Sequence, residues 1–384
     1  MFRNLKTYIT HPQYNSLGLV FGLMSVIFTF WVTRVPELKI KLDLSESELG
    51  LSLLFIPIGS ILAMFTSSGV INKTGAGKAT VYTVVYSAIT SIFPLLAASL
   101  PGFCFTLFLL GLGVGWVEVA ANAVVGILEQ KNNVKIMSTS HGFFSLGGIL
   151  GALVGGLLAG WGVPALPHFC ITTLVIVIIL LVYVRPRLSP VKDANVAEGP
   201  VFAFPGRALA GMAVVGFCVL LSEGALADWS AVYLREILPS NQAYMAGFGY
   251  AAFSVMMTLG RFNGDFIIEK AGNKKVLLVG LILASAGTFL LVTAGFIPVL
   301  IGFILAGAGY SCVVPVIFSY AASNHPVSSA HGIASLAGTG FSGFLVGPVA
   351  IGFIAEYYGL ANSFYLLFGL TVLSLGVVFG NRRL

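Results

Sequence analysis

The sequence predicts an all-α membrane protein with twelve transmembrane helices, arranged as two pseudo-symmetric six-helix bundles. Three observations lead to this prediction. Charged residues make up 9% of the 384 residues, whereas a soluble domain carries about 25%. Hydrophobic residues make up 57% and gather in twelve runs, each of about 20 residues, the length that crosses a bilayer as a helix. Motifs of the first half of the chain also recur in the second half.

The twelve apolar runs form two groups of six, separated by a polar segment. They cover about 16–36, 48–70, 79–99, 102–128, 138–160, 164–184, 207–234, 243–268, 276–295, 297–322, 331–355 and 361–380. The polar segment, residues 185–206, contains four prolines and several charges. It is interpreted as a cytoplasmic linker because it is too short to fold alone. The predicted bundles are residues 1–184 and 207–384.

The basic residues predict the orientation of the helices. With both termini in the cytoplasm, fifteen Lys and Arg lie in the inside segments, and three, Lys39, Lys41 and Arg235, lie in the outside loops. Such an excess is typical of cytoplasmic loops. The excess of basic residues is therefore explained without a nucleic-acid partner. We expect a multi-pass protein of a bacterial-type cytoplasmic (inner) membrane.

Four motifs recur in register, at an offset that drifts from 198 to 190 residues. The matched positions are Trp31 and Trp229, Gly75 and Gly272, Gly111 and Gly307, and His141 and His331. This agreement indicates a duplicated six-helix unit. Parallel repeats of this kind place a substrate site near the middle of the membrane, where the repeats meet.

Glu118 is a carboxylate near the centre of the fourth apolar run. On a helix it shares a face with Gly111, Gly115 and Asn122, because the steps between them are four, three and four. A charge at that depth costs about 2.5–3.5 kcal/mol on insertion scales unless it faces protein or water. Glu118 is therefore the predicted proton-coupling residue. The alternative is a structural acid that is paired with a neighbouring helix.

Residues 68–78 resemble the loop motif G-x-x-x-D-R-x-G-x-K of the major facilitator superfamily, with Asn72 and Lys73 in place of the usual Asp and Arg. A second, better charged copy begins at Gly260-Arg261. The resemblance covers the whole chain and implies the major facilitator fold and secondary transport.

Within that superfamily, Glu118-Val-Ala-Ala-Asn122 resembles the E-T-A-A-N of fucose permease-like sugar/proton symporters. In that group the acid is associated with proton coupling. Residues 30–37 and 223–234 look like an uncharacterised branch beside it. The fucose permeases carry a second acid in the first helix, whereas residues 16–33 contain no charge. The resemblance therefore does not imply a mechanism with two carboxylates.

Three polar residues of the first half are predicted to bind substrate. Asn122 can hydrogen-bond either the acid or a solute hydroxyl. His141 corresponds to a Gln near the sugar in the fucose permease-like pattern, and Ser145 adds a hydroxyl one turn later. For His141 the alternative is a residue that caps its helix or packs at an interface.

Trp31 and Trp229 have two interpretations. They suit stacking on a sugar ring or gating of the outer mouth, with Tyr233 one turn beyond Trp229. They also suit the interfacial aromatic belt of a membrane protein. We include both as candidate substrate-binding residues.

The seventh run carries two acids. Glu223 and Asp228 are five residues apart, hence about 140° apart around a helix. Glu223 is the deeper of the two and a candidate for the substrate route. Asp228 lies near the outer end and is interpreted as an interface residue.

A cytoplasmic latch is predicted at the end of the eighth run. Arg261 and Asp265 are four residues apart, a spacing that supports a local ion pair of a few tenths of a kcal/mol. The sharper interpretation is a gating pair that breaks when the cytoplasmic side opens. Lys73 lies in the repeat-related loop of the first half and belongs to a weaker set of charged partners for this latch.

The sequence also argues against several classes of protein. The four cysteines stand singly in apolar segments and form no C-x-x-C pair, so neither a metal site nor a cofactor is expected. No P-loop or nucleophile motif is present, which argues against an enzyme and against transport driven by ATP.

The function expected from the sequence is secondary active symport of a small polar solute, most plainly a sugar, driven by protons. The alternative is a proton-coupled exporter of amphipathic compounds or metabolites. A channel or a signalling receptor on the same fold is a third possibility, and the pronounced duplication counts against a receptor. The expected partners are the solute, protons and the lipid bilayer, and the expected state is a monomer.

Overall fold

The computed structural model describes residues 8, 10–132, 134, 136–191, 206, 209–293, 295–324 and 329–381, and their regular structure is entirely helical. Within these residues eleven helices are long and apolar enough to cross a membrane. A further helix, α12 (Phe248–Ala271), has 24 residues and takes the eighth place in the order. Its second half is interrupted by Arg261, Asn263 and Asp265. The predicted all-α membrane architecture is confirmed.

The contacts divide the chain into two units, and the first comprises Met1–Leu44, Ser52–Ala197 and Ala243–Met245. Its helices are α2 (Pro12–Lys41), α4 (Phe55–Thr74), α5 (Ala76–Thr90), α6 (Phe93–Leu96), α7 (Leu100–Asn132), α8 (Met137–Gly160), α9 (Ala165–Ile178), the π-helix η1 (Ile179–Val184) and α10 (Arg185–Leu188). Of α3 (Glu46–Leu53), most residues are grouped with the second unit.

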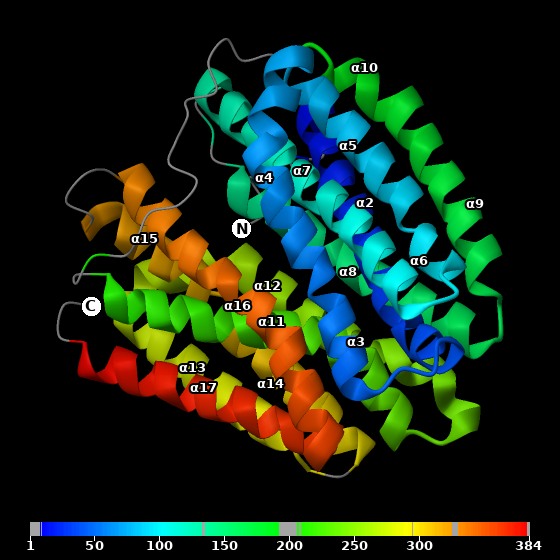
Figure 1. Ribbon diagram of the computed structural model, residues 1–384. Helices are drawn as coiled ribbons and strands as arrows, with labels where there is room; N and C mark the ends of the chain where they lie inside the picture. Colours follow the sequence, from blue (N-terminus) through cyan, green and yellow to red (C-terminus); the bar gives the residue numbers. More distant parts are fainter. Residues whose placement is uncertain are drawn as a thin grey trace. The chain divides into compact units, whose positions relative to one another are not determined.

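One helix pair and one group of three helices organise the first unit. α2 packs along α8, and α7 packs against both α4 and α5 (Figure 1). Small residues of α8 explain the contact of α2 with α8, because a Cβ added to Gly147 would overlap the carbonyl oxygen of Gly22 in α2. In lipid the hydrophobic effect does not drive helices together, so small residues stabilise helix pairs by allowing their backbones to approach closely. The core between the helices is aliphatic and includes Val117, Ala121 and Val125 of α7.

The second unit comprises Ser45–Leu51, Glu198–Gln242 and Ala246–Leu384. Besides α12, its helices are α11 (Ala210–Ile237), the 3₁₀ helix η2 (Ser240–Gly247), α13 (Asn273–Leu290), α14 (Phe296–Tyr310), α15 (Val313–Asn324), α16 (Ser329–Tyr358) and α17 (Leu360–Gly380). α11 packs against α16 and α17, α13 packs against α14, and α12 packs against α14. The pairing α12 with α14 repeats that of α4 with α7.

Matched glycines show that the repeat read from the sequence is also a repeat in geometry. Gly75 and Gly272 end the second helix of each half with φ angles of 82° and 81°, a conformation that favours glycine. A Cβ on Gly111 would overlap the carbonyl oxygen of Ile56 in α4, and a Cβ on Gly307 that of Phe253 in α12. The same turn and the same close helix contact therefore occur in both units.

The predicted bundle boundaries stay predictions. α10 carries the sixth spanning helix past residue 184 to Leu188. Most of the predicted linker, residues 192–205, lies outside the described residues, as does the side chain of His331.

Candidate functional site

Glu118 and Asn122 form a hydrogen-bonded pair on α7. The Asn122 side-chain amide donates to Oε1 of Glu118 at 2.8 Å and to the Glu118 backbone carbonyl at 2.8 Å. The pair follows from the helix itself, because residues four apart lie one turn above each other on the same face. The predicted juxtaposition of acid and amide is therefore present in the structure.

Within the described residues, Glu118 has a hydrogen-bond partner but no ion-pair partner. Among the described residues, no Lys, Arg or His nitrogen forms an ion pair with its carboxylate. The amide oxygen of Asn122 is buried and has no hydrogen-bond partner within the same part of the chain. A carboxyl group held by a neutral amide can gain or lose a proton without breaking a salt bridge. The amide oxygen stays available for a donor such as a hydroxyl.

His141 and Ser145 lie near the start of α8. The His141 ring packs edge-on against Phe21 of α2, with 5.2 Å between the ring centroids. The Ser145 hydroxyl donates to the backbone carbonyl of His141 at 3.3 Å. No hydrogen bond or ion pair joins the Glu118 carboxylate to His141 in the described part of the chain. Substrate binding by His141 and Ser145 stays a prediction.

Trp31 of α2 and Trp229 of α11 are buried in matching ways. They are 1% and 0% exposed, and both indole N–H groups lack a hydrogen-bond partner among the described residues. Such burial does not suit the interfacial aromatic belt, which faces lipid headgroups. Tyr233, one turn beyond Trp229, donates its hydroxyl to the backbone carbonyl of Leu291 at 2.5 Å, within the same unit.

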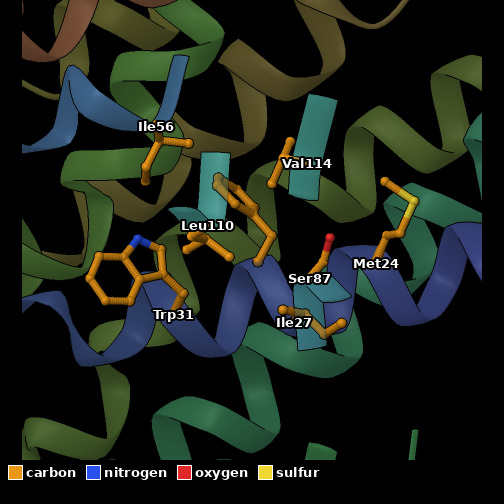
Figure 2. A pocket seen from close by; sticks show the side chains of 8 residues that line it. Met24, Ile27, Trp31, Ile56, Ser87, Leu110 and Val114 are labelled. Atoms are coloured by element: carbon orange, nitrogen blue, oxygen red, sulfur yellow. The ribbon is translucent and has the colours of Figure 1, made fainter. Parts of the chain in front are cut away.

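A small cavity of about 30 Å³ lies beside Trp31 in the first unit (Figure 2). Its wall is mostly apolar, with Met24, Ile27, Ile56, Leu110 and Val114 around the indole and Ser87 as a polar member. The volume is that of a water molecule or two. It is too small for a sugar in this conformation.

We expect Trp31→Phe to change the free energy of unfolding by no more than about 1 kcal/mol. The smaller ring enlarges the cavity, which costs about 24 cal/mol per Å³. The change also removes a buried unpaired N–H, whose burial costs about 1–3 kcal/mol. Thermal unfolding of the purified protein measures the balance. A variant that is as stable as the wild type yet loses solute binding would show that the indole N–H contacts the solute.

Glu223 of α11 and Arg261 of α12 form an ion pair in the second unit. Nη2 of Arg261 lies 3.7 Å from Oε2 of Glu223, and the side chains are 20% and 12% exposed. The pair joins two helices that were considered separately in the sequence. Arg261 was assigned there to a latch with Asp265, and the structure adds Glu223 as its partner.

Two further polar groups lie near this pair. Tyr250 of α12 is within electrostatic range of Arg261, Glu223 and Asp228. Tyr310 of α14 is within range of Glu223, and its hydroxyl lies 2.6 Å from that of Thr371 in α17. The interior of the second unit is therefore polar around Glu223.

The predicted latch stays a prediction. Asp265 lies on α12, but its side chain lies outside the described residues. Lys73 is exposed in the last turn of α4, and no ion pair or hydrogen bond of its side chain occurs among the described residues.

Arg34 of α2 is a buried charge that the sequence did not lead us to predict. Its guanidinium is 1% exposed, contacts the carboxylate of Glu37 and lies 3.4 Å from Nδ1 of His168 in α9. Nε of Arg34 and Nε2 of His168 are buried without partners among the described residues. The available signal in the sequence was a basic residue inside the first apolar run, at about residues 16–36.

Known proteins resemble the chain over almost its full length. The family model of the Major Facilitator Superfamily matches residues 16–263 and 212–383. The chain belongs to this superfamily. As a major facilitator protein it is a multi-pass membrane transporter and not an enzyme.

Two relatives and one solved structure resemble this major facilitator protein over most of its length. An uncharacterised MFS-type transporter of Yersinia pestis is 35% identical over 358 residues, covering 92% of this chain and 91% of that protein. The L-fucose-proton symporter of Escherichia coli (strain K12) is 24% identical over 397 residues, covering 90% and 89%. The crystal structure of the nucleoside transporter NupG has a TM-score of 0.73 at 13% identity, covering 96% and 99%. That structural likeness confirms the fold.

Proposed function

We propose that the chain is a proton-coupled symporter of a small polar solute, such as a sugar, that works by alternating access between its two six-helix halves. The observation that carries this proposal is the pair of Glu118 and Asn122, a carboxyl group in a membrane helix that an amide hydrogen-bonds at 2.8 Å. The carboxyl group is assigned the proton. The unpartnered amide oxygen of Asn122 is assigned to the solute. Binding of the solute and binding of the proton then influence each other, because the two groups are hydrogen-bonded.

The L-fucose-proton symporter of Escherichia coli, which is 24% identical to this chain, supports the same proposal. The distribution of basic residues supports a bacterial-type cytoplasmic membrane with both termini inside, since fifteen Lys and Arg fall on one side and three on the other. A monomer is proposed because the two halves of one chain already supply both repeats of the transporter.

The test begins with a thermal-shift screen of the purified protein against sugars, sugar acids, nucleosides and drugs. A ligand of the folded state raises the melting temperature by mass action. The protein is then reconstituted in vesicles that enclose a pH-sensitive dye, and the stabilising solute is added outside. Symport acidifies the vesicle lumen whichever way the protein is inserted, because solute and proton move together.

The opposite outcome supports the alternative. Alkalinisation of the lumen would indicate exchange of solute for protons, as expected of an exporter of amphipathic compounds or metabolites. Solute entry with no change of pH would refute proton coupling of either kind.

A further inference from the structure

The sixth spanning helix of the first unit, formed by α9, η1 and α10, carries an exposed apolar stripe. Within the described residues it is the least buried of the eleven helices that are long and apolar enough to cross a membrane. Its exposed apolar side chains recur every three or four residues, so they share one face: Ile171, Leu174, Ile178, Leu181 and Val182. Arg185 is the next position in this series, and its side chain is also exposed. A stripe that suits acyl chains therefore ends in a cation.

A second exposed face lies on α5, which packs beside the sixth spanning helix (Figure 1). Lys78, Tyr82 and Ile89 are four and seven residues apart, so they lie on one side of α5. Tyr82 and Ile89 are exposed, and Lys78 in the first turn is half-buried. A tyrosine near the end of a membrane helix is typical of the headgroup level. Lys78 and Arg185 thus each lie at the end of a face that is suited to lipid.

The backbone brings these two cations to the same place. The Gly77 N–H donates to the backbone carbonyl of Val191 at 3.0 Å, and a Cβ added to Gly77 would overlap the carbonyl oxygen of Leu188. The start of α5 therefore lies directly against the end of α10. Lys78 follows Gly77 in the chain. Arg185 precedes Leu188 by about one turn, which is about 4.5 Å along a helix, so both long side chains can reach a single ligand.

Neither cation is neutralised within the described residues, where no hydrogen bond or ion pair involves the side chain of Lys78 or Arg185. Arg187 differs, because its Cζ lies 3.8 Å from the centroid of the Tyr183 ring and its Nη1 donates to the Tyr183 backbone carbonyl at 2.6 Å. Helices α5, α9, η1 and α10 contain no Asp or Glu. Glu129, near the end of α7, accepts hydrogen bonds from backbone N–H groups at the start of α8. The described part of the junction between α5 and α10 is therefore positively charged.

We propose that Lys78 and Arg185 bind the headgroup phosphate of an anionic phospholipid, whose acyl chain lies along the stripe of the sixth spanning helix. The stripe favours a lipid over a free phosphate, which has no apolar part to place there. The two positive charges favour an anionic lipid over a zwitterionic one, because a zwitterionic headgroup brings its own cation to the site. In the proposed orientation the lipid belongs to the cytoplasmic leaflet, whose anionic lipids attract basic residues beside membrane helices. The bound lipid bridges α5 and α10 and stabilises the first unit.

The test compares two phospholipids with the same acyl chains on the purified full chain in a neutral detergent. Dioleoylphosphatidylglycerol is anionic, and dioleoylphosphatidylcholine is zwitterionic. We expect the anionic lipid to raise the melting temperature by mass action and the zwitterionic lipid to give little or no shift. Inorganic phosphate and glycerol 3-phosphate carry the anion without acyl chains, and at the same concentration they should give no shift. The shift should shrink between about 0.05 M and about 0.5 M NaCl, because salt screens exposed charges.

Variants locate the site through the concentration of phosphatidylglycerol that gives half of the shift. Lys78→Gln and Arg185→Gln should each raise this concentration about fivefold and together about 25-fold, since one cation near an anionic lipid contributes roughly this factor. Arg185→Lys keeps the charge and should stay within about twofold of the wild type, because lysine also binds phosphate. Lys131→Gln is the matched control. It removes an exposed positive charge from the last turn of α7 in the same unit, and it should also stay within about twofold.

The proposal is overturned if the zwitterionic lipid or a soluble phosphate shifts the melting temperature as much as the anionic lipid does, or if the double variant binds the anionic lipid as the wild type does. If the double variant cannot be purified, the two single variants decide. An equal loss of binding in Lys131→Gln and Arg185→Gln also overturns it, because the attraction would then come from the net charge of the unit. These assays involve neither solute nor proton gradient, so their outcome is independent of the symport proposed for Glu118.

Discussion

Glu118→Gln is expected to abolish accumulation of solute driven by a proton gradient while keeping solute binding and exchange. The glutamine has the shape of the protonated acid and cannot release a proton. It can still meet the Asn122 side chain, because its amide presents both a donor and an acceptor where the wild-type carboxylate accepts at 2.8 Å. A carrier locked in the protonated form can bind solute and return with it, but it cannot return empty.

Two transport assays on the same vesicles separate these steps. Uptake into vesicles with an imposed pH gradient measures accumulation, and exchange of labelled for unlabelled solute at equal pH measures binding and reorientation. The variant should lose the first and keep the second, so exchange serves as its internal control for folding and insertion. Normal accumulation under the gradient would assign the proton to another group, and Glu223 would be the next residue to change.

The pair of Glu118 and Asn122 could be predicted because one helix determines it. Residues four apart share a face whenever the segment is helical, and a run of about 20 apolar residues in a membrane leaves the backbone few alternatives to a helix. The close approach of α8 to α2 at Gly147 likewise depends on a small residue of one helix. Features that depend on a single helix and its small residues are therefore accessible from the sequence.

The contact of Glu223 with Arg261 could not be predicted in the same way. It depends on the rotation of α11 relative to α12, and both helices are apolar on most of their circumference, so no amphipathic pattern sets that rotation. Burial of Trp229 has the same cause. A tryptophan near a helix end suits either lipid headgroups or the interior of the unit, and the choice follows from tertiary packing.

The burial of Arg34 also depends on tertiary packing and could not be predicted from one helix. Its effect on stability is expected to be larger, because the buried group is charged. Its partners are Glu37 one turn further on α2 and His168 on α9. The helical spacing gives the first partner, but only the packing of α9 on this side of the unit buries the guanidinium. A basic residue close to a membrane helix end usually extends toward the interface. Arg34 instead is 1% exposed.

Glu37→Gln is therefore expected to destabilise the protein more than Arg34→Met does. Glu37→Gln leaves the buried guanidinium without its carboxylate, whereas Arg34→Met leaves a carboxylate that is 45% exposed and can turn to water. Loss of a partner in a fully buried pair costs about 3–5 kcal/mol. Since Glu37 is partly exposed, we expect about 1.5–3 kcal/mol, the range for a hydrogen bond to a charged group.

Thermal unfolding of the purified variants in one detergent gives the order of stability, and the double variant Arg34→Met with Glu37→Gln completes the comparison. The double variant should be more stable than Glu37→Gln alone, because replacing a buried ion pair with apolar and neutral groups removes the uncompensated charge. If Glu37→Gln and Arg34→Met unfold at the same temperature, burial of Arg34 carries no charge penalty. The guanidinium would then have to be stabilised by its contact with His168 and not by Glu37.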